Sequence, residues 1–277
     1  MGSSHLTTQA DKAEQFLALH HGPDVLRLPN PWDAGSARLL AALGFAALAT
    51  TSSGFAATLG RPDGTVSLDE ALAHGAAVAA ATNVPVSADL ENGFADDPEG
   101  VARTVRLAKE AGLAGCSVED FSAGDLGPIY DKALAVERIA AASAAAKQPP
   151  GRLVLTARAE NYLHGRPDLD DTISRLVAYQ EAGADVLYAP GLTSLDDVRA
   201  VVGALDRPVN VLLLRGGPSI PELHQAGVRR VSVGGSLAFA ALEAVVTAAR
   251  ELREDESYGF LDRAAAGRAA AADAFGG

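Results

Sequence analysis

The chain has 277 residues, of which 48 % are hydrophobic and 21 % are charged, a composition typical of folded globular proteins. Its 35 acidic and 23 basic side chains give a net charge of -12, which argues against binding to nucleic acid or to an anionic membrane surface, since both need a basic face. Cys116 is the single cysteine, so an internal disulfide is excluded and the sequence suits a reducing cytoplasm.

The start of the chain, "MGSSHLTTQADKAEQ", is polar and lacks the apolar core of a signal peptide. No apolar run reaches the roughly 18 residues that span a bilayer. We therefore predict a disordered or vector-derived leader over residues 1–15, a single domain over residues 16–277 and a cytoplasmic location.

Eight short apolar runs recur along the chain, and each is followed by a loop and a helical pattern. The runs are rich in Val, Leu and Ala without polar alternation, as is typical of parallel strands buried on both faces. They predict strands over residues 25–28, 46–50, 84–88, 115–119, 153–157, 185–189, 209–214 and 230–234.

The segments between the runs have the pattern of amphipathic helices. "SLDEALAHGAAVAAAT" and "DPEGVARTVRLAKEAG", for example, open on a Ser or Asp that can cap a helix, and the second closes on a Gly that can end one. Eight such units in about 250 residues predict an α/β fold of the (β/α)8 TIM-barrel type, with an open doubly wound sheet as the alternative. The Ala-rich tail "LDRAAAGRAAAADAF" predicts an extra helix or an arm that contacts another subunit.

Acidic side chains gather where the predicted strands end, which is the functional face of such a barrel. Asp89 ends the third strand, Glu119 ends the fourth, and Asp63 lies in the loop after the second. Because residues i and i+2 of a strand share a face, we expect Asp89 and Glu91 to point together into the mouth of the barrel. Arg158 ends the fifth strand.

Four converging carboxylates would repel one another unless a cation lies between them. Oxygen ligands suit Mg²⁺, with Mn²⁺ as an alternative, and Mg²⁺ keeps several waters, so that one or two acids suffice for direct contact. The competing interpretation is that each acid caps the following helix, as Asp120 is placed to do.

Four motifs, "SSGFAATLGRPD", "SADLENGF", "AGCSVED" and "LTARAEN", occur in this order, and most of the chain resembles the isocitrate lyase / phosphoenolpyruvate mutase superfamily. The resemblance implies a (β/α)8 barrel whose last helix is exchanged between the subunits of a homodimer or homotetramer. It also implies that the partner is a small-molecule 2-oxo acid or a related di-acid.

The resemblance also assigns roles to residues. It makes Asp89 the direct Mg²⁺ ligand and Glu91 and Glu119 ligands that act through water. It makes Arg158 the clamp for an anionic end of the substrate, where a guanidinium can form a bidentate fork. The remaining substrate-binding residues that we predict are Ser53, Gly54 and Phe55 after strand two, with Asp89 and with Asn210 on strand seven; Asp63, Glu119, Arg158 and Tyr130 are the predicted catalytic residues.

The loop after strand four departs from the family pattern. It reads "EDFSAGDLGPIYDK" and lacks both the Lys-Lys-Cys-Gly-His type of segment of the lyases and the Lys-Thr-Asn type of the mutases. Cys116 cannot replace the lyase cysteine, because strand alternation turns it toward the helices. Tyr130, Asp125 and Lys132 remain for proton transfer on this loop, whose two glycines suit a lid, and His164 is a further candidate.

Together with this resemblance, the sequence predicts an Mg²⁺-dependent, lyase-like enzyme, a lyase or a hydrolase, that cleaves a C–C bond of a small 2-oxo or 2-hydroxy di-acid through an enolate. The enolate charge would develop next to the cation. The alternatives are C–P bond chemistry on phosphonopyruvate or phosphoenolpyruvate, and a catalytically silent 2-oxo acid binder.

Overall fold

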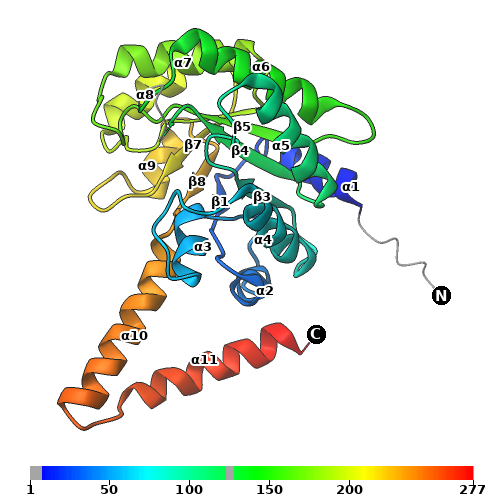
Figure 1. Cartoon of the computed structure of the whole chain (residues 1–277). Helices are drawn as coiled ribbons and strands as arrows, with labels where there is room; N and C mark the ends of the chain where they lie inside the picture. The colour runs from blue at the N-terminus through cyan, green and yellow to red at the C-terminus, as the bar shows by residue number, and fades with distance from the viewer. Residues whose placement is uncertain (1–7, 123–127, 277) are drawn as a thin grey trace.

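The computed structural model describes residues 8–122 and 128–276, and these form a barrel of eight parallel strands with helices between them (Figure 1). The strands pair in the order β1-β8-β7-β6-β5-β4-β3-β2. The last gap is bridged near the carboxyl ends of β1 and β2, where the Ala49 amide donates to the Pro29 carbonyl at 3.1 Å. The predicted (β/α)8 barrel is confirmed.

Each predicted strand is present, and each of its ends lies within two residues of the predicted position. The strands are β1 (Leu26–Leu28), β2 (Leu48–Ala49), β3 (Val86–Asp89), β4 (Gly115–Glu119), β5 (Val154–Arg158), β6 (Val186–Tyr188), β7 (Val209–Leu212) and β8 (Arg230–Ser232). The helices are α1 (Gln9–Leu19), α2 (Ala34–Ala42), α3 (Ser52–Thr58), α4 (Leu68–Ala80), α5 (Pro98–Glu110), α6 (Lys132–Lys147), α7 (Leu169–Glu181), α8 (Leu195–Gly203), α9 (Ile220–Gln225), α10 (Ser236–Glu254) and α11 (Phe260–Phe275).

The helix ends follow the sequence signals. Ser67 caps α4 and forms a reciprocal capping box with Glu70, which satisfies two backbone donors of the first turn. Gly112 and Gly183 follow α5 and α7 with φ of 85° and 101°, a left-handed conformation that glycine adopts without a steric penalty. These caps set the short turns that lead each helix back into the next strand.

Helix α1 closes the amino-terminal end of the barrel. Ala13 and Phe16 are fully buried and pack with Leu26, Val154 and Val186, the first residues of β1, β5 and β6. The boundary that we predicted at residue 16 therefore falls inside this helix, while residues 1–7 lie outside the described part of the chain. Cys116 is fully buried in the layer between strands and helices, as strand alternation predicts.

The two last helices leave the body of the barrel. In Figure 1, α10 projects away from the strands and α11 runs back toward α2. Ala238 is the one buried residue of α10, and large apolar side chains of this helix, Phe239, Leu242, Val245, Val246 and Leu252, are exposed. Among the described residues, no helix is both long enough and apolar enough to cross a membrane.

Candidate active site

Arg158 is the centre of the acidic cluster at the carboxyl ends of the strands. Its guanidinium contacts three carboxylates: Nη1 lies 2.8 Å from Asp89, Nη2 lies 3.0 Å from Glu119, and Nε lies 2.8 Å from Glu160. The strand register explains the contact between Arg158 and Glu119, since Glu119 on β4 lies directly opposite Arg158 on β5. The face of the guanidinium also lies 5.2 Å from the centre of the Tyr188 ring.

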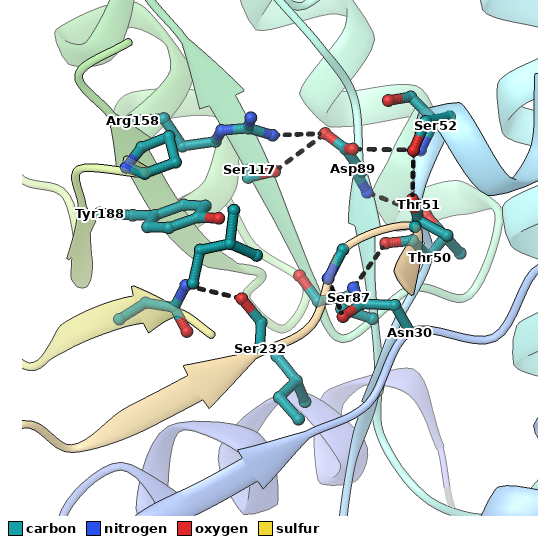
Figure 2. A pocket seen from close by; sticks show the side chains of 18 of the residues that line it. Asn30, Thr50, Thr51, Ser52, Ser87, Asp89, Ser117, Arg158, Tyr188 and Ser232 are labelled. Carbon is teal, nitrogen blue, oxygen red and sulfur yellow. Dashed lines mark hydrogen bonds and ion pairs between the residues drawn. The ribbon is translucent and has the colours of Figure 1, made fainter. Parts of the chain in front are cut away.

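The carboxylate of Asp89 is held from several sides (Figure 2). One of its oxygens accepts the Ser52 amide at the start of α3 at 3.1 Å, and the other accepts the Ser117 hydroxyl at 3.4 Å and Arg158. The backbone amide of Asp89 donates to Thr50 Oγ1 at 2.9 Å. Asp89 is therefore fixed with its oxygens facing the open end of the barrel.

Burial and mutual repulsion make the other acids hard to ionise. Burial raises the pKa of Glu119 well above its ordinary value; Arg158 opposes this, while the charges of Glu160 and Asp89 add to it. Burial likewise raises the pKa of Glu160, which Arg158 again opposes. When they are ionised, the three carboxylates therefore have only one guanidinium to share.

Glu91 lines the outer part of the same opening, but its backbone conformation differs from the one that the strand pattern predicts. Strand β3 ends at Asp89, Leu90 is fully buried, and Glu91 has a left-handed backbone with φ of 47°. The expected shared strand face of Asp89 and Glu91 is therefore wrong. The carbonyl of Glu91 instead accepts the Glu119 amide at 2.9 Å, and burial, with the charges of Asp89 and Asp63, raises the pKa of Glu91 to about 7.

Two neighbouring cavities share Arg158 in their walls. The inner cavity, of about 200 Å³, runs into the barrel. The outer cavity, of about 440 Å³, lies among the acids, and Arg158, Asp63, Ser52 and Leu163 line both. The side chains that face the inner cavity include Asn30, Thr50, Ser53, Ser87, Asp89, Ser117, Tyr188, Asn210, Arg230 and Ser232; the outer cavity is lined by Glu91, Glu119, Phe121, Glu160 and His164 among others.

The predicted segment after strand two is only partly in the cavity. Ser53 lines it, but Phe55 turns away, and its ring stacks on His74 with centroids 3.9 Å apart. Gly54 is buried with its amide directed at Thr51 Oγ1, and an added Cβ would lie 2.6 Å from the Thr51 methyl carbon. Gly54 thus allows α3 to pack closely against Trp32 and α10, while neither Gly54 nor Phe55 faces the space where a substrate would bind.

Tyr130 lies outside both cavities. It is fully buried, its hydroxyl donates to Asp96 and accepts from Asn92 Nδ2 at 3.0 Å, and its ring packs 4.1 Å from the Arg138 guanidinium. The structure does not bring it to the acidic cluster. Lys132 donates to Ser174 at 2.8 Å, and the predicted lid residue Asp125 lies outside the described residues.

Asp63 and His164 lie at the mouth. Asp63 is exposed in a turn that borders both cavities. His164 stacks on Phe121 with ring centroids 3.7 Å apart, its Nε2 lies 3.8 Å from Glu160, and burial lowers its pKa. Tyr188 and Ser232, which line the inner cavity, were missed from the sequence, because isolated hydroxyl groups on short strands carry no distinctive pattern.

The residues that would hold a divalent cation fit one in chemistry. Within residues 8–122 and 128–276, no three acidic, histidine or cysteine side chains are grouped so that they could hold a metal ion, and the Arg158 guanidinium lies between Asp89 and Glu119. The donors are all carboxylate oxygens, the ligands that Mg²⁺ and Mn²⁺ prefer, and Asp89, Glu119 and Glu160 share the one guanidinium of Arg158.

Comparison with known proteins assigns the chain to a protein family. The model of the phosphoenolpyruvate phosphomutase family matches residues 16–253. The chain belongs to this family. It is therefore a member of the isocitrate lyase / phosphoenolpyruvate mutase superfamily, and the resemblance seen in its motifs is confirmed.

Similar proteins cover most of the chain. A crystal structure from Burkholderia cenocepacia J2315, described as that of a lyase or mutase, is 56 % identical with a TM-score of 0.89 and covers 92 % of each chain. An oxaloacetate acetylhydrolase in complex with its product oxalate is 27 % identical with a TM-score of 0.82, covering 91 % of this chain and 90 % of that one. An uncharacterized protein of Mycobacterium tuberculosis is 36 % identical over 87 % of this chain and 90 % of its own.

Proposed function

We propose that this protein is a divalent-cation-dependent enzyme that cleaves a C–C bond of a small 2-oxo or 2-hydroxy di-acid, with Mg²⁺ as the cation. The observation that carries the proposal is the meeting of Asp89, Glu119 and Glu160 on the single guanidinium of Arg158, at the mouth of a cavity. Family membership and the similarity to an oxaloacetate acetylhydrolase support the same reaction class.

Asp89 is the residue that would hold the cation directly, and Glu91 and Glu119 would hold its water ligands. When bound, the cation supplies positive charge next to the oxygen on which enolate charge develops. The Ser52 amide and the Ser117 hydroxyl keep the Asp89 carboxylate in place, so that its orientation does not depend on Arg158 alone.

Arg158 has two alternative partners in this proposal. Without substrate, its positive charge offsets the negative charges of Asp89 and Glu119. If Asp89 held a cation and Glu119 its water ligands, the guanidinium would be free to donate a bidentate pair of hydrogen bonds to a substrate carboxylate. Glu160, 2.8 Å from Nε, keeps the group from swinging out of the cavity, and the Tyr188 ring supports its face.

Proton transfer is assigned to the mouth of the cavity. Asp63 and His164 border the outer cavity, and Tyr130 is left out because its hydroxyl is engaged elsewhere. Burial keeps His164 neutral near pH 7, which suits a base that accepts a proton from a 2-hydroxyl group or from water.

The direct test is turnover by the full chain. Oxaloacetate, 2-methylisocitrate and phosphonopyruvate are incubated with Mg²⁺ or with EDTA, and release of oxalate, pyruvate and phosphate is followed. We expect Mg²⁺-dependent C–C cleavage of one di-acid, and a loss of about 10³-fold or more in Asp89→Ala. Asp24→Ala, an exposed acid ahead of β1, is the matched control and keeps full activity.

Other outcomes assign other functions. Isomerisation of phosphonopyruvate to phosphoenolpyruvate, or its hydrolysis to pyruvate and phosphate, would favour C–P bond chemistry, which the phosphomutase family model supports as the second candidate. Mg²⁺-dependent binding of a 2-oxo acid without turnover would indicate a silent binder. Activity that is equal in Mg²⁺ and EDTA, or unchanged in Asp89→Ala, contradicts the cation assignment.

We also propose that α10 and α11 are exchanged between subunits of a homodimer or homotetramer. Support comes from α10, which carries five exposed large apolar side chains and buries only Ala238, and from α11, which has no buried residue. Two such helices gain stability only when a second surface covers them.

A further inference from the structure

Arg230 is a buried guanidinium at the floor of the inner cavity. It begins β8 in register with Leu26 on one side and Asn210 on the other, it is 4 % exposed, and it contributes to the cavity wall. We use the name floor for the part of the cavity formed by Asn210, Arg230 and Ser232. Burial of a charged group is costly unless the charge is compensated, so its surroundings need an explanation.

Every partner of Arg230 is neutral. Nε donates to Asn210 Oδ1 at 2.9 Å, and Nη2 donates to Thr156 Oγ1 at 3.0 Å. Nη1 lies 3.1 Å from His20 Nε2. In the described part of the chain Arg230 forms no ion pair with Asp or Glu, whereas Arg158, 14 % exposed, forms three. Burial lowers the pKa of Arg230 to about 9, which still leaves it charged at pH 7.

His20 accepts from Arg230 and adds no charge. Its Nδ1 lies 2.7 Å from the Phe16 carbonyl, which can only accept, so Nδ1 carries the proton and Nε2 presents a lone pair to Nη1. Burial and the nearby Arg230 lower the pKa of His20 to about 3. Helix α1 therefore supports the guanidinium from below without neutralising it.

Arg230 also decides how the amide of Asn210 is turned. A guanidinium has donors only, so the Asn210 atom that faces Nε is the oxygen. The amide nitrogen then lies on the other side, where it donates to Ser232 Oγ at 3.0 Å and borders the cavity. The Ser232 hydroxyl, which accepts this bond, is also hydrogen-bonded to Tyr188. The second hydrogen of the Asn210 amide nitrogen is then the donor that the floor presents to the cavity, next to an uncompensated positive charge.

We propose that Arg230 is a positioning and specificity-determining residue, which orients Asn210 as a donor and makes the floor a receptor for a second carboxylate of the substrate. The inference rests on the proposed function in that the first carboxylate lies near Arg158 and the cation. An apolar end of a substrate gains nothing from this floor and a neutral polar end gains only a hydrogen bond, whereas a carboxylate also recovers electrostatic energy that burial of Arg230 costs.

The test compares two unreactive acids that differ by one carboxylate. Binding of succinate and of butyrate to the full-length protein is measured by calorimetry, in Mg²⁺ and separately in EDTA. For the unsubstituted protein we expect succinate to bind at least about tenfold more tightly than butyrate, as one charge-assisted contact provides. This comparison needs no substitution and therefore does not depend on the folding of a variant.

Three variants then identify the source of the preference. Arg230→Gln is expected to bring the succinate-to-butyrate ratio close to one. Arg230→Lys keeps the charge but loses the Nε bond to Asn210, and retains part of the ratio. Arg229→Gln, which changes the exposed neighbour, leaves the ratio unchanged.

The outcomes separate this inference from the cation assignment. A preference for succinate that disappears in Arg230→Gln supports the inference, and it does so whether or not Mg²⁺ strengthens binding; the dependence on Mg²⁺ reports on the cation alone. A ratio near one in the unsubstituted protein, or a ratio that Arg230→Gln leaves unchanged while both affinities fall together, overturns it.

Discussion

Glu91 offers the sharpest test of the electrostatics of the mouth, because its carboxyl group prefers to be neutral in the folded protein. Burial, together with Asp89 and Asp63, raises its pKa from 4.5 to about 7. In the unfolded chain the group ionises near its ordinary value. The folded protein therefore binds more protons than the unfolded chain between about pH 4.5 and pH 7, and the contribution of Glu91 to the free energy of unfolding falls as the pH rises through this window.

The size of the effect follows from the shift. A difference of this size corresponds to about 3 kcal/mol if fully expressed, and solvent screening of this half-buried side chain reduces it to roughly 1–2 kcal/mol. Glu91→Gln removes the ionisation. The predicted quantity is the free energy of unfolding of Glu91→Gln minus that of the unsubstituted protein, both measured in EDTA. We expect this difference to be about 1–2 kcal/mol larger at pH 8 than at pH 4.5.

Urea unfolding of dilute protein, followed by circular dichroism at several pH values from 4.5 to 8, measures this difference. Glu110→Gln, at an exposed position on α5, is the control and should give a difference that does not vary across the window. The reasoning is refuted if Glu91→Gln and the unsubstituted protein show parallel pH profiles, or if the advantage of the variant lies at low pH.

Two further substitutions test the support of the site and the arm. Asp120→Asn weakens a buried cluster in which Asp120 accepts from Tyr179 at 2.6 Å, from Arg175 at 3.2 Å and from the Glu160 amide at 2.8 Å. Urea unfolding should show a loss of about 3 kcal/mol, and an unchanged midpoint would contradict the role of this cluster. Leu242→Asp on the exposed face of α10 should convert an oligomer into a monomer in light scattering, with the far-ultraviolet spectrum retained; an oligomer of unchanged mass would argue against helix exchange.

The parts of the site that the sequence predicted are those set by strand ends. Asp89, Glu119 and Arg158 each close a strand, and a parallel barrel brings such positions together at one end whatever the details of its loops. The register of β4 against β5 then places Glu119 directly opposite Arg158. The eight strands were predictable for the same reason, because strands buried on both faces leave continuous apolar runs.

What the sequence did not predict depends on packing between distant segments. The left-handed backbone of Glu91 moved it off the strand face that alternation assigns to it. Phe55 and Tyr130 were turned away from the cavity by a histidine ring and by an acid elsewhere in the fold. Arg230 reads in the sequence as one of a pair of ordinary basic residues, and only the barrel interior shows which of the two is buried.

The central claim is that a divalent cation binds to Asp89 at the carboxyl end of the barrel. Crystals of the full chain soaked with Mn²⁺ and oxalate test it through the anomalous signal of the metal. The account predicts one peak about 2.1 Å from an Asp89 carboxylate oxygen, with Arg158 turned from Glu119 toward the oxalate. Absence of any peak at Asp89, with Arg158 still joined to Asp89 and Glu119, would contradict it.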